Sequence, residues 1–338
     1  MKEVLIILDG LMEEALEKED LKNLILGKFS KEANIEMTNY ITKNKQVDSL
    51  NCIFKILGYP PNEYDLGDRA YYEALSKGIE LRENETILRC NIVKKNKDIL
   101  EDFTGGNLGD NLEEVLNKIN LKDGRVIHCD NYKNLLILKD EDLSILNSKC
   151  YEPHFNVNKK IEDIIPNNNL LREIIYNSAS YFNKNNLENR ILWPWGPCRK
   201  VNIESFKEKH KKRGTLISGI DLVCGMGIAL NMNSIKPKGC NGYSNTLLTS
   251  KLKEGLKALE KDDIVIIHVN GLDELAHTKN YYEKLKFMEK IQSELIIPMI
   301  ESLKNKGNYN MIITCDHRTD SSTGNHEELD VPRITIKI

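Results

Sequence analysis

The chain has 338 residues, 40% of them hydrophobic, so it is long enough to bury a substantial core and to form two domains. Lys and Arg total 48 against 51 Asp and Glu, and the resulting net charge of -3 gives no electrostatic basis for binding nucleic acid or an anionic membrane. We therefore expect a globular protein that binds its ligand, a small molecule, through local groups.

The most apolar N-terminal run, Val4 to Leu8, is far shorter than a signal-peptide core or a membrane span. Acidic residues follow it closely. We therefore expect a cytoplasmic protein with neither a membrane partner nor a nucleic-acid partner.

Three short apolar runs predict central strands of a parallel sheet that is covered on both faces. They are Val4 to Leu8, Ile264 to Val269 and Met311 to Cys315, and each is bounded by polar or turn-forming residues. A fourth run, Arg333 to Ile338, predicts an additional strand.

Two stretches keep the 3.6-residue apolar period of a helix, residues 247–259 and 282–299. We expect Pro298 to kink or shorten the second of them. Strands that alternate with helices predict an α/β fold with a doubly wound sheet.

The middle of the chain differs in character, with Asn- and Lys-rich loops, shorter apolar runs and a Pro- and Gly-containing turn cluster at 193–197. This shift predicts a second, smaller α/β domain inserted at residues 79–213. Residues 1–78 and 214–338 would then form one discontinuous catalytic domain.

An acidic residue follows each of the three central strands. Asp9 and Asp316 come directly after their strands, and Asp273 comes after a short turn. A single Asp of this kind is more often a helix N-cap or a turn former. Three of them favour a ligand site, because the carboxyl ends of parallel strands meet at one edge of the sheet.

Histidines accompany these acids. His277 stands four residues after Asp273, which places both side chains on one face of a helix; His317 follows Asp316, and His326 lies in the next polar loop. A lone histidine is more often structural. An Asp/His set without paired cysteines favours two divalent ions, Mn²⁺ or Zn²⁺, which together can hold a phosphoryl group. We interpret the histidines without acidic neighbours as structural or solvent-exposed: His128, His154 and His210.

An ordered series of motifs runs along nearly the whole chain: Leu8-Asp9-Gly10, Leu57-Gly58-Tyr59-Pro60, Arg89-Cys90-Asn91, Asp273-Glu274-x-x-His277, Asp316-His317-Arg318-Thr319, and His326 before Asp330-Val331-Pro332. The series resembles the archaeal-type, cofactor-independent phosphoglycerate mutases of the alkaline phosphatase superfamily. This resemblance implies an alkaline phosphatase-like fold and phosphoglycerate as the substrate.

The resemblance also implies the roles of individual residues. In the family a Ser stands ten residues before the Tyr of L-G-Y, and here that position is Ser49, which would become a phosphoserine intermediate. One ion would be bound by Asp9, Ser49, Asp316 and His317. The other would be bound by Asp273, His277 and His326. Ser49 would equally suit a helix N-cap.

Arg69 and Arg89 align with family arginines and would hold the phosphoglycerate, although a surface salt bridge suits either arginine as well. The family pattern is altered near the substrate, with Leu50 after the serine and Asn107 at a position that is usually Arg. The implied function is therefore interconversion of 3- and 2-phosphoglycerate. The alternatives are a related metal-dependent phosphatase or phosphotransferase for another small phosphorylated metabolite, and a metal-binding protein without turnover.

Overall fold

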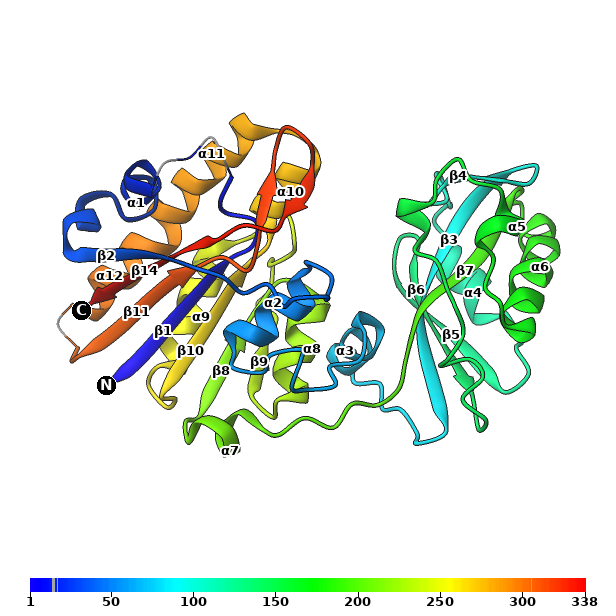
Figure 1. Ribbon diagram of the computed structural model, residues 1–338, viewed down its shortest axis with the longest axis horizontal. Helices are drawn as coiled ribbons and strands as arrows, with labels where there is room; N and C mark the ends of the chain where they lie inside the picture. The colour runs from blue at the N-terminus through cyan, green and yellow to red at the C-terminus, as the bar shows by residue number, and fades with distance from the viewer. Residues whose placement is uncertain (14–15, 17, 305) are drawn as a thin grey trace. The chain divides into compact units, whose positions relative to one another are not determined.

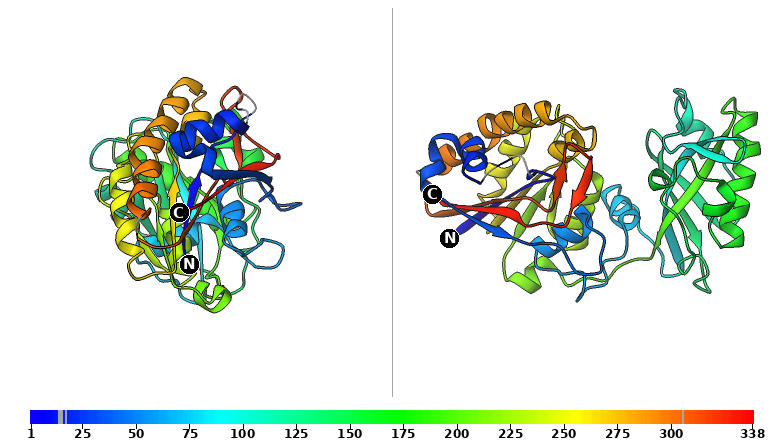
Figure 2. Two further views of the ribbon diagram at one scale, coloured as in Figure 1. Left: turned by 90° about the vertical axis from the view of Figure 1, so that its left-hand side faces the viewer. Right: turned by 45° about the horizontal axis from the view of Figure 1, so that its top comes forward.

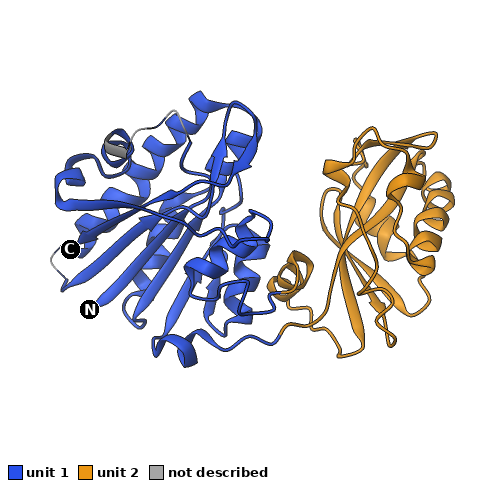
Figure 3. Cartoon of the chain, viewed as in Figure 1, with its two compact units in different colours: residues 1–66, 202–338 blue, residues 67–201 orange. Residues whose placement is uncertain are grey.

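The computed structural model describes residues 1–13, 16, 18–304 and 306–338 (Figures 1 and 2). These residues form two compact units, which Figure 3 colours separately. Unit 1 contains residues 1–66 and 202–338, and unit 2 contains residues 67–201.

The boundaries of unit 2 lie earlier in the chain than the 79 and 213 expected for an inserted domain. Helix α3 (Arg69–Ser76) packs against strands β3 (Glu85–Asn96) and β7 (Arg190–Cys198), so it belongs with them. The later segment that contains Phe206 is tied to unit 1, because the Phe206 N–H donates to the Leu230 carbonyl.

A seven-stranded sheet forms the centre of unit 1, in the order β2-β14-β11-β1-β10-β8-β9. The strands are β1 (Lys2–Leu8), β2 (Ala33–Thr38), β8 (Gly214–Ile217), β9 (Asn233–Ile235), β10 (Ile264–Val269), β11 (Tyr309–Thr314) and β14 (Val331–Lys337). Neighbours from β11 to β9 are parallel, whereas β14 is antiparallel to both β11 and β2. A two-stranded hairpin is made by β12 (Arg318–Asp320) and β13 (Asn325–Glu327).

Helices cover both faces of this sheet, which confirms the predicted doubly wound α/β fold. Figure 2 shows α11 and α12 on one side of the sheet and α2 on the other. The helices of unit 1 are α1 (Lys18–Leu26), α2 (Ser49–Ile56), α7 (Phe206–His210), α8 (Asp221–Ala229), α9 (Leu248–Ala258), α10 (Gly271–His277), α11 (Tyr281–Ile291) and α12 (Ile297–Leu303), with a 3-10 turn at Gly27–Glu32. One continuous apolar core joins α9, α11 and α12 to alternate residues of β1.

Pro298 does not end the helical run, because residues on both sides of it remain helical. A π-helical turn, Gln292–Ile296, joins α11 to α12, and Pro298 occupies the first turn of α12. A proline in that position removes an N–H group that has no partner within the new helix. The helical run is therefore not shortened, but its regular α-helical geometry is interrupted directly before Pro298, and the predicted kink stays a prediction.

Unit 2 is a smaller α/β unit with an antiparallel sheet in the order β4-β3-β6-β5, to which β7 is added on β3. Its further strands are β4 (Ile99–Asp102), β5 (Gly124–Asp130) and β6 (Lys133–Lys139), and its further helices are α4 (Leu112–Asn117), α5 (Ile161–Ile164) and α6 (Asn169–Lys184), with a 3-10 turn at Pro153–Phe155. Helix α6 packs on β7. Within the described residues of the chain, no helix combines the length and apolar character that a membrane crossing requires.

Candidate metal centre

The carboxyl ends of β1, β10 and β11 bring the predicted acids together. The register pairs Leu8 with Val269 and Ile7 with Thr314, so the three strands end at the same edge. Asp9 and Asp316 follow β1 and β11, and Asp273 lies on α10 just beyond β10. All three carboxylates are buried.

One group of ligand atoms surrounds His317 on the β11 side. Its Nε2 lies 3.5 Å from Asp9 Oδ1 and 3.3 Å from Asp316 Oδ2. The hydroxyl of Ser49 joins them, with Oγ 3.3 Å from Asp9 Oδ2 and 3.4 Å from His317 Nε2. The four side chains come from three segments that are far apart in the sequence.

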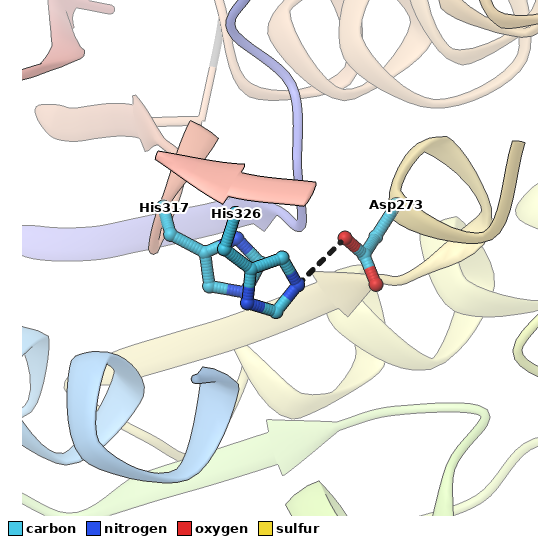
Figure 4. Close-up of side chains that lie close together, drawn as sticks. All are labelled: Asp273, His317 and His326. Atoms are coloured by element: carbon cyan, nitrogen blue, oxygen red, sulfur yellow. Dashed lines mark ion pairs between the residues drawn. The ribbon is translucent and has the colours of Figure 1, made fainter. Parts of the chain in front are cut away.

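A second group surrounds Asp273. Its Oδ2 lies 3.2 Å from His277 Nε2, as the i, i+4 spacing on α10 predicts, and its Oδ1 lies 3.5 Å from His326 Nε2. Figure 4 shows His326 from the β13 strand facing Asp273, with His317 beside it. The His317 and His326 rings are stacked with centroids 3.8 Å apart, so the two groups adjoin.

The predicted division of ligands is less strict in the structure, because His317 lies between the groups. Ligand atoms of Asp9, Asp316 and His317 lie within 4.8 Å of one another, and so do those of Asp273, His317 and His326. Each set is compact enough to hold a cation.

Hydrogen bonds assign the same tautomer to all three histidines. The Nδ1 atoms of His277 and His326 lie 2.8 Å from the backbone oxygens of Gly324 and Val47, which can only accept. The Nδ1 of His317 lies 3.2 Å from Thr319 Oγ1, whose hydrogen is donated to Asp273 Oδ1 at 2.6 Å.

In the neutral form of each ring this tautomer leaves the lone pair on Nε2, on the side of the carboxylates, whereas a protonated ring donates from Nε2 to the carboxylate. The Nε2 atoms of His277 and His326 lie only 3.3 Å apart. Two lone pairs at that distance repel each other unless a proton or a cation lies between them. A histidine that donates its other ring N–H to a backbone carbonyl is the usual arrangement of a metal ligand.

Three of the four carboxylate oxygens on the His317 side lack hydrogen-bond donors among the described residues. Asp9 Oδ1 and both oxygens of Asp316 are buried and accept no hydrogen bond from the residues that the structure describes. Burial, followed by repulsion from Asp316 and Asp273, raises the pKa of Asp9 well above its usual value. Buried acceptors of this kind need a positive charge, and an oxygen and imidazole donor set fits Mn²⁺ or Zn²⁺.

The pKa of Asp273 is shifted in the opposite direction, because imidazoles surround its carboxylate. Burial alone would raise the pKa of Asp273, but hydrogen bonds from His277 and His326 outweigh burial and hold it well below the usual value. In return, the hydrogen bond to Asp273 raises the pKa of His277 to about 9. A cation bound here would displace that proton.

Ser49 is the first residue of α2, and the residue before it is the N-cap. The Asp48 carboxylate accepts the Asn51 N–H at 2.8 Å, so the helix-cap interpretation of Ser49 is wrong by one position. Ser49 is 8% exposed, and its hydroxyl is left to interact with Asp9 and His317.

Arg69 and Arg89 both lie in unit 2. Arg69 begins α3, and its Nε is buried without a hydrogen-bond partner among the described residues. Arg89, on β3, places its Nε 3.2 Å from Glu73 Oε2 and its guanidinium 4.7 Å from the Trp195 ring centroid. Their role in substrate binding stays a prediction.

The sequence assigned no role to several buried polar residues that support these groups. His268 on β10 lies 3.1 Å from Asp9 Oδ2, and the ammonium of Lys284 lies 2.5 Å from Glu13 Oε1 and 3.0 Å from the Thr319 carbonyl. A histidine within an apolar strand is a signal that could have identified His268. No sequence signal singled out Lys284, because it lies on a helix that is otherwise rich in charged residues.

Comparisons with known proteins agree with the motif series. The family described as 2,3-bisphosphoglycerate-independent phosphoglycerate mutase matches residues 31–188. A relative of that name from Methanothrix thermoacetophila is 28% identical over 295 residues, which cover 82% of this chain and 74% of the relative.

Two solved structures share the fold along 99% of this chain. A Pyrococcus horikoshii protein has a TM-score of 0.73 at 20% identity, with 87% of its own chain covered. The cofactor-independent phosphoglycerate mutase from Thermoplasma acidophilum has a TM-score of 0.59 at 20% identity, with 89% covered. The chain is therefore similar in sequence to proteins named 2,3-bisphosphoglycerate-independent phosphoglycerate mutase and shares its fold with a solved structure of that enzyme, in agreement with the resemblance of its ordered motifs.

Proposed function

We propose that this chain interconverts 3- and 2-phosphoglycerate through a phosphoserine at Ser49, beside two divalent metal ions, either Mn²⁺ or Zn²⁺. The observation that carries the proposal is the position of the Ser49 hydroxyl, within 3.5 Å of both Asp9 and His317. The names of the sequence relatives support phosphoglycerate as the substrate.

The residues that would hold the ions are those already described: Asp9, Ser49, Asp316 and His317 for one, and Asp273, His277 and His326 for the other. Bound divalent ions would neutralise charge on the phosphoryl group and make the serine hydroxyl more acidic. The buried acceptor oxygens of Asp9 and Asp316 support this assignment.

The Ser49 side chain would carry the phosphoryl group between the 3-oxygen and the 2-oxygen of the glycerate. In the first step Ser49 Oγ forms a bond to phosphorus, the bond from phosphorus to the 3-oxygen breaks, and that oxygen takes up the proton released by Ser49. In the second step the 2-oxygen forms a bond to phosphorus, the bond from phosphorus to Ser49 Oγ breaks, and Ser49 Oγ takes up the proton that the 2-hydroxyl releases. The start of α2 favours the anion, because helix N-termini carry partial positive charge.

Water must be kept away while the phosphoserine exists, because its hydrolysis would turn the mutase into a phosphatase. The test therefore measures two products at once. With Mn²⁺ or Zn²⁺ supplied, the purified protein should convert 3- to 2-phosphoglycerate faster than it releases phosphate. Release of phosphate without isomerisation would favour the phosphatase or phosphotransferase alternative.

The nucleophile is tested with a matched pair of variants. Ser49→Ala should abolish interconversion and the phosphorylated peptide that mass spectrometry detects after acid quenching. Ser293→Ala, which changes an exposed serine on the π-helical turn, should retain both. Full activity in the Ser49 variant would refute the proposal, and absence of phosphoserine and of turnover in the wild type would favour a metal-binding protein.

A further inference from the structure

A row of buried polar groups approaches Oδ2 of the Asp9 carboxylate, whereas His317 lies nearest to Oδ1. His268 is fully buried, with Nε2 3.1 Å from Asp9 Oδ2 and Nδ1 3.2 Å from Ser218 Oγ. The three residues lie at the ends of β1, β10 and β8, which are adjacent strands. The row is therefore set by the parallel register of the sheet.

The direction of each hydrogen bond follows from the Asp9 carboxylate, which as a cation ligand can only accept. The ring proton of His268 therefore lies on Nε2 and is donated to Asp9 Oδ2. Nδ1 then accepts the hydroxyl hydrogen of Ser218, while Ser218 Oγ accepts the Ile220 N–H at 3.2 Å. This tautomer is opposite to that of the three histidines in the candidate metal centre.

Both ring nitrogens of His268 are thus occupied, so His268 is not placed to bind a cation. Its backbone is also held, because the fully buried Lys251 donates from Nζ to the His268 carbonyl at 2.6 Å. What remains available on Asp9 is Oδ1, the oxygen that accepts no hydrogen bond among the described residues.

We propose that His268 and Ser218 are positioning residues that fix the Asp9 carboxylate so that Oδ1 faces the cation. The inference rests on the proposed metal site. A fixed donor on one oxygen of a ligating carboxylate restricts its rotation, and loss of such a partner lowers metal affinity by about 10–100-fold in comparable sites.

Two amide substitutions distinguish the contribution of the His268 Nε2 atom from that of its Nδ1 atom. Gln places its amide N–H near the position of histidine Nε2, whereas Asn reaches only the position of Nδ1. His268→Gln should therefore keep the Mn²⁺ dissociation constant within about threefold of wild type, and His268→Asn should weaken binding at least tenfold. His128→Asn, which changes a histidine of unit 2, is the matched control and should leave Mn²⁺ affinity unchanged.

The affinity is measured by the electron paramagnetic resonance signal of free Mn²⁺, with Mn²⁺ alone as the probe. Equal affinity in His268→Asn and wild type would overturn the proposal. If the Asn variant does not fold, Ser218→Ala provides the same test, with an expected loss of about three- to tenfold, because the tautomer is no longer fixed. Unchanged affinity in that variant would equally overturn it.

A second readout does not depend on metal. Nitrogen-15 NMR of the metal-free wild-type protein should show His268 with its proton on Nε2, and Ser218→Ala should shift that signal. A proton found on Nδ1 would refute the proposed row of hydrogen bonds. If the wild type binds no Mn²⁺, the proposed function and the positioning role fail together, whereas normal Mn²⁺ binding with the wrong tautomer refutes only the positioning role.

Discussion

Thr319 is the direct link between the two ligand groups, and its removal should weaken both. Its hydroxyl donates to Asp273 Oδ1 at 2.6 Å and lies 3.2 Å from His317 Nδ1. Thr319→Val keeps the shape but removes the hydroxyl. A buried hydrogen bond to a charged group contributes about 1.5–3 kcal/mol, and every 1.4 kcal/mol is about tenfold in affinity. We expect Mn²⁺ affinity to fall about 10–100-fold.

The assay is isothermal titration with Mn²⁺, together with urea unfolding of the metal-free protein. Thr86→Val is the matched control, because the fully buried Thr86 donates to the buried Asp140 at 2.7 Å, within unit 2. Both variants should lose about 1–3 kcal/mol of unfolding free energy, but only Thr319→Val should lose metal affinity. An equal loss of metal affinity in both, or in neither, would refute the reasoning.

Two further predictions concern backbone strain and pH. Gly10→Ala should weaken Mn²⁺ binding in titration, because an added Cβ would lie 2.8 Å from Asp273 Cα and the backbone has φ +66°. Gly78→Ala is the control, because Gly78 has a similar φ of +69° but no atom within 4 Å of an added Cβ. This control variant carries the backbone strain alone and should bind Mn²⁺ normally. Glu85→Gln should lower the unfolding free energy by about 1 kcal/mol at pH 7, because the hydrogen bond from Arg125 lowers the pKa of Glu85 in the folded state. That stabilisation is present above the unfolded-state pKa of Glu85 and is lost as pH falls through the lower folded-state pKa. The unfolding free energies of wild type and Glu85→Gln should therefore converge in acid. The fluorescence of the two tryptophans, both in unit 2, reports the unfolding. A difference that persists in strong acid would contradict this origin.

The strands and the acids that follow them were predictable because both obey local rules. A short, continuous apolar run is typical of a central parallel strand, and strands of this kind end at a common edge. Asp9, Asp273 and Asp316 therefore converge as expected. The i, i+4 spacing also predicted that the His277 side chain lies on the same face as Asp273, because α10 is helical at these residues.

Long-range features of the site were not predictable from patterns. Ser49 lies after a polar loop without periodicity, and only the family resemblance selected it. The role of His268 depends on hydrogen bonds across adjacent strands, which periodicity does not reveal. The start of unit 2 differs from the expected domain boundary because α3 packs against β3 and β7, and composition does not reveal such packing.

Two fully buried lysines hold the backbone behind a centre made of distant segments. Lys251 donates to the His268 carbonyl, and Lys284 donates to the Thr319 carbonyl while it pairs with Glu13. An unpaired buried ammonium costs several kcal/mol, so each lysine stays at its carbonyl partner and restrains the backbone behind the ligands. Thr319 in turn donates to Asp273, and His268 lies 3.1 Å from Asp9, so each lysine restrains the backbone of a residue that contacts a carboxylate of the centre.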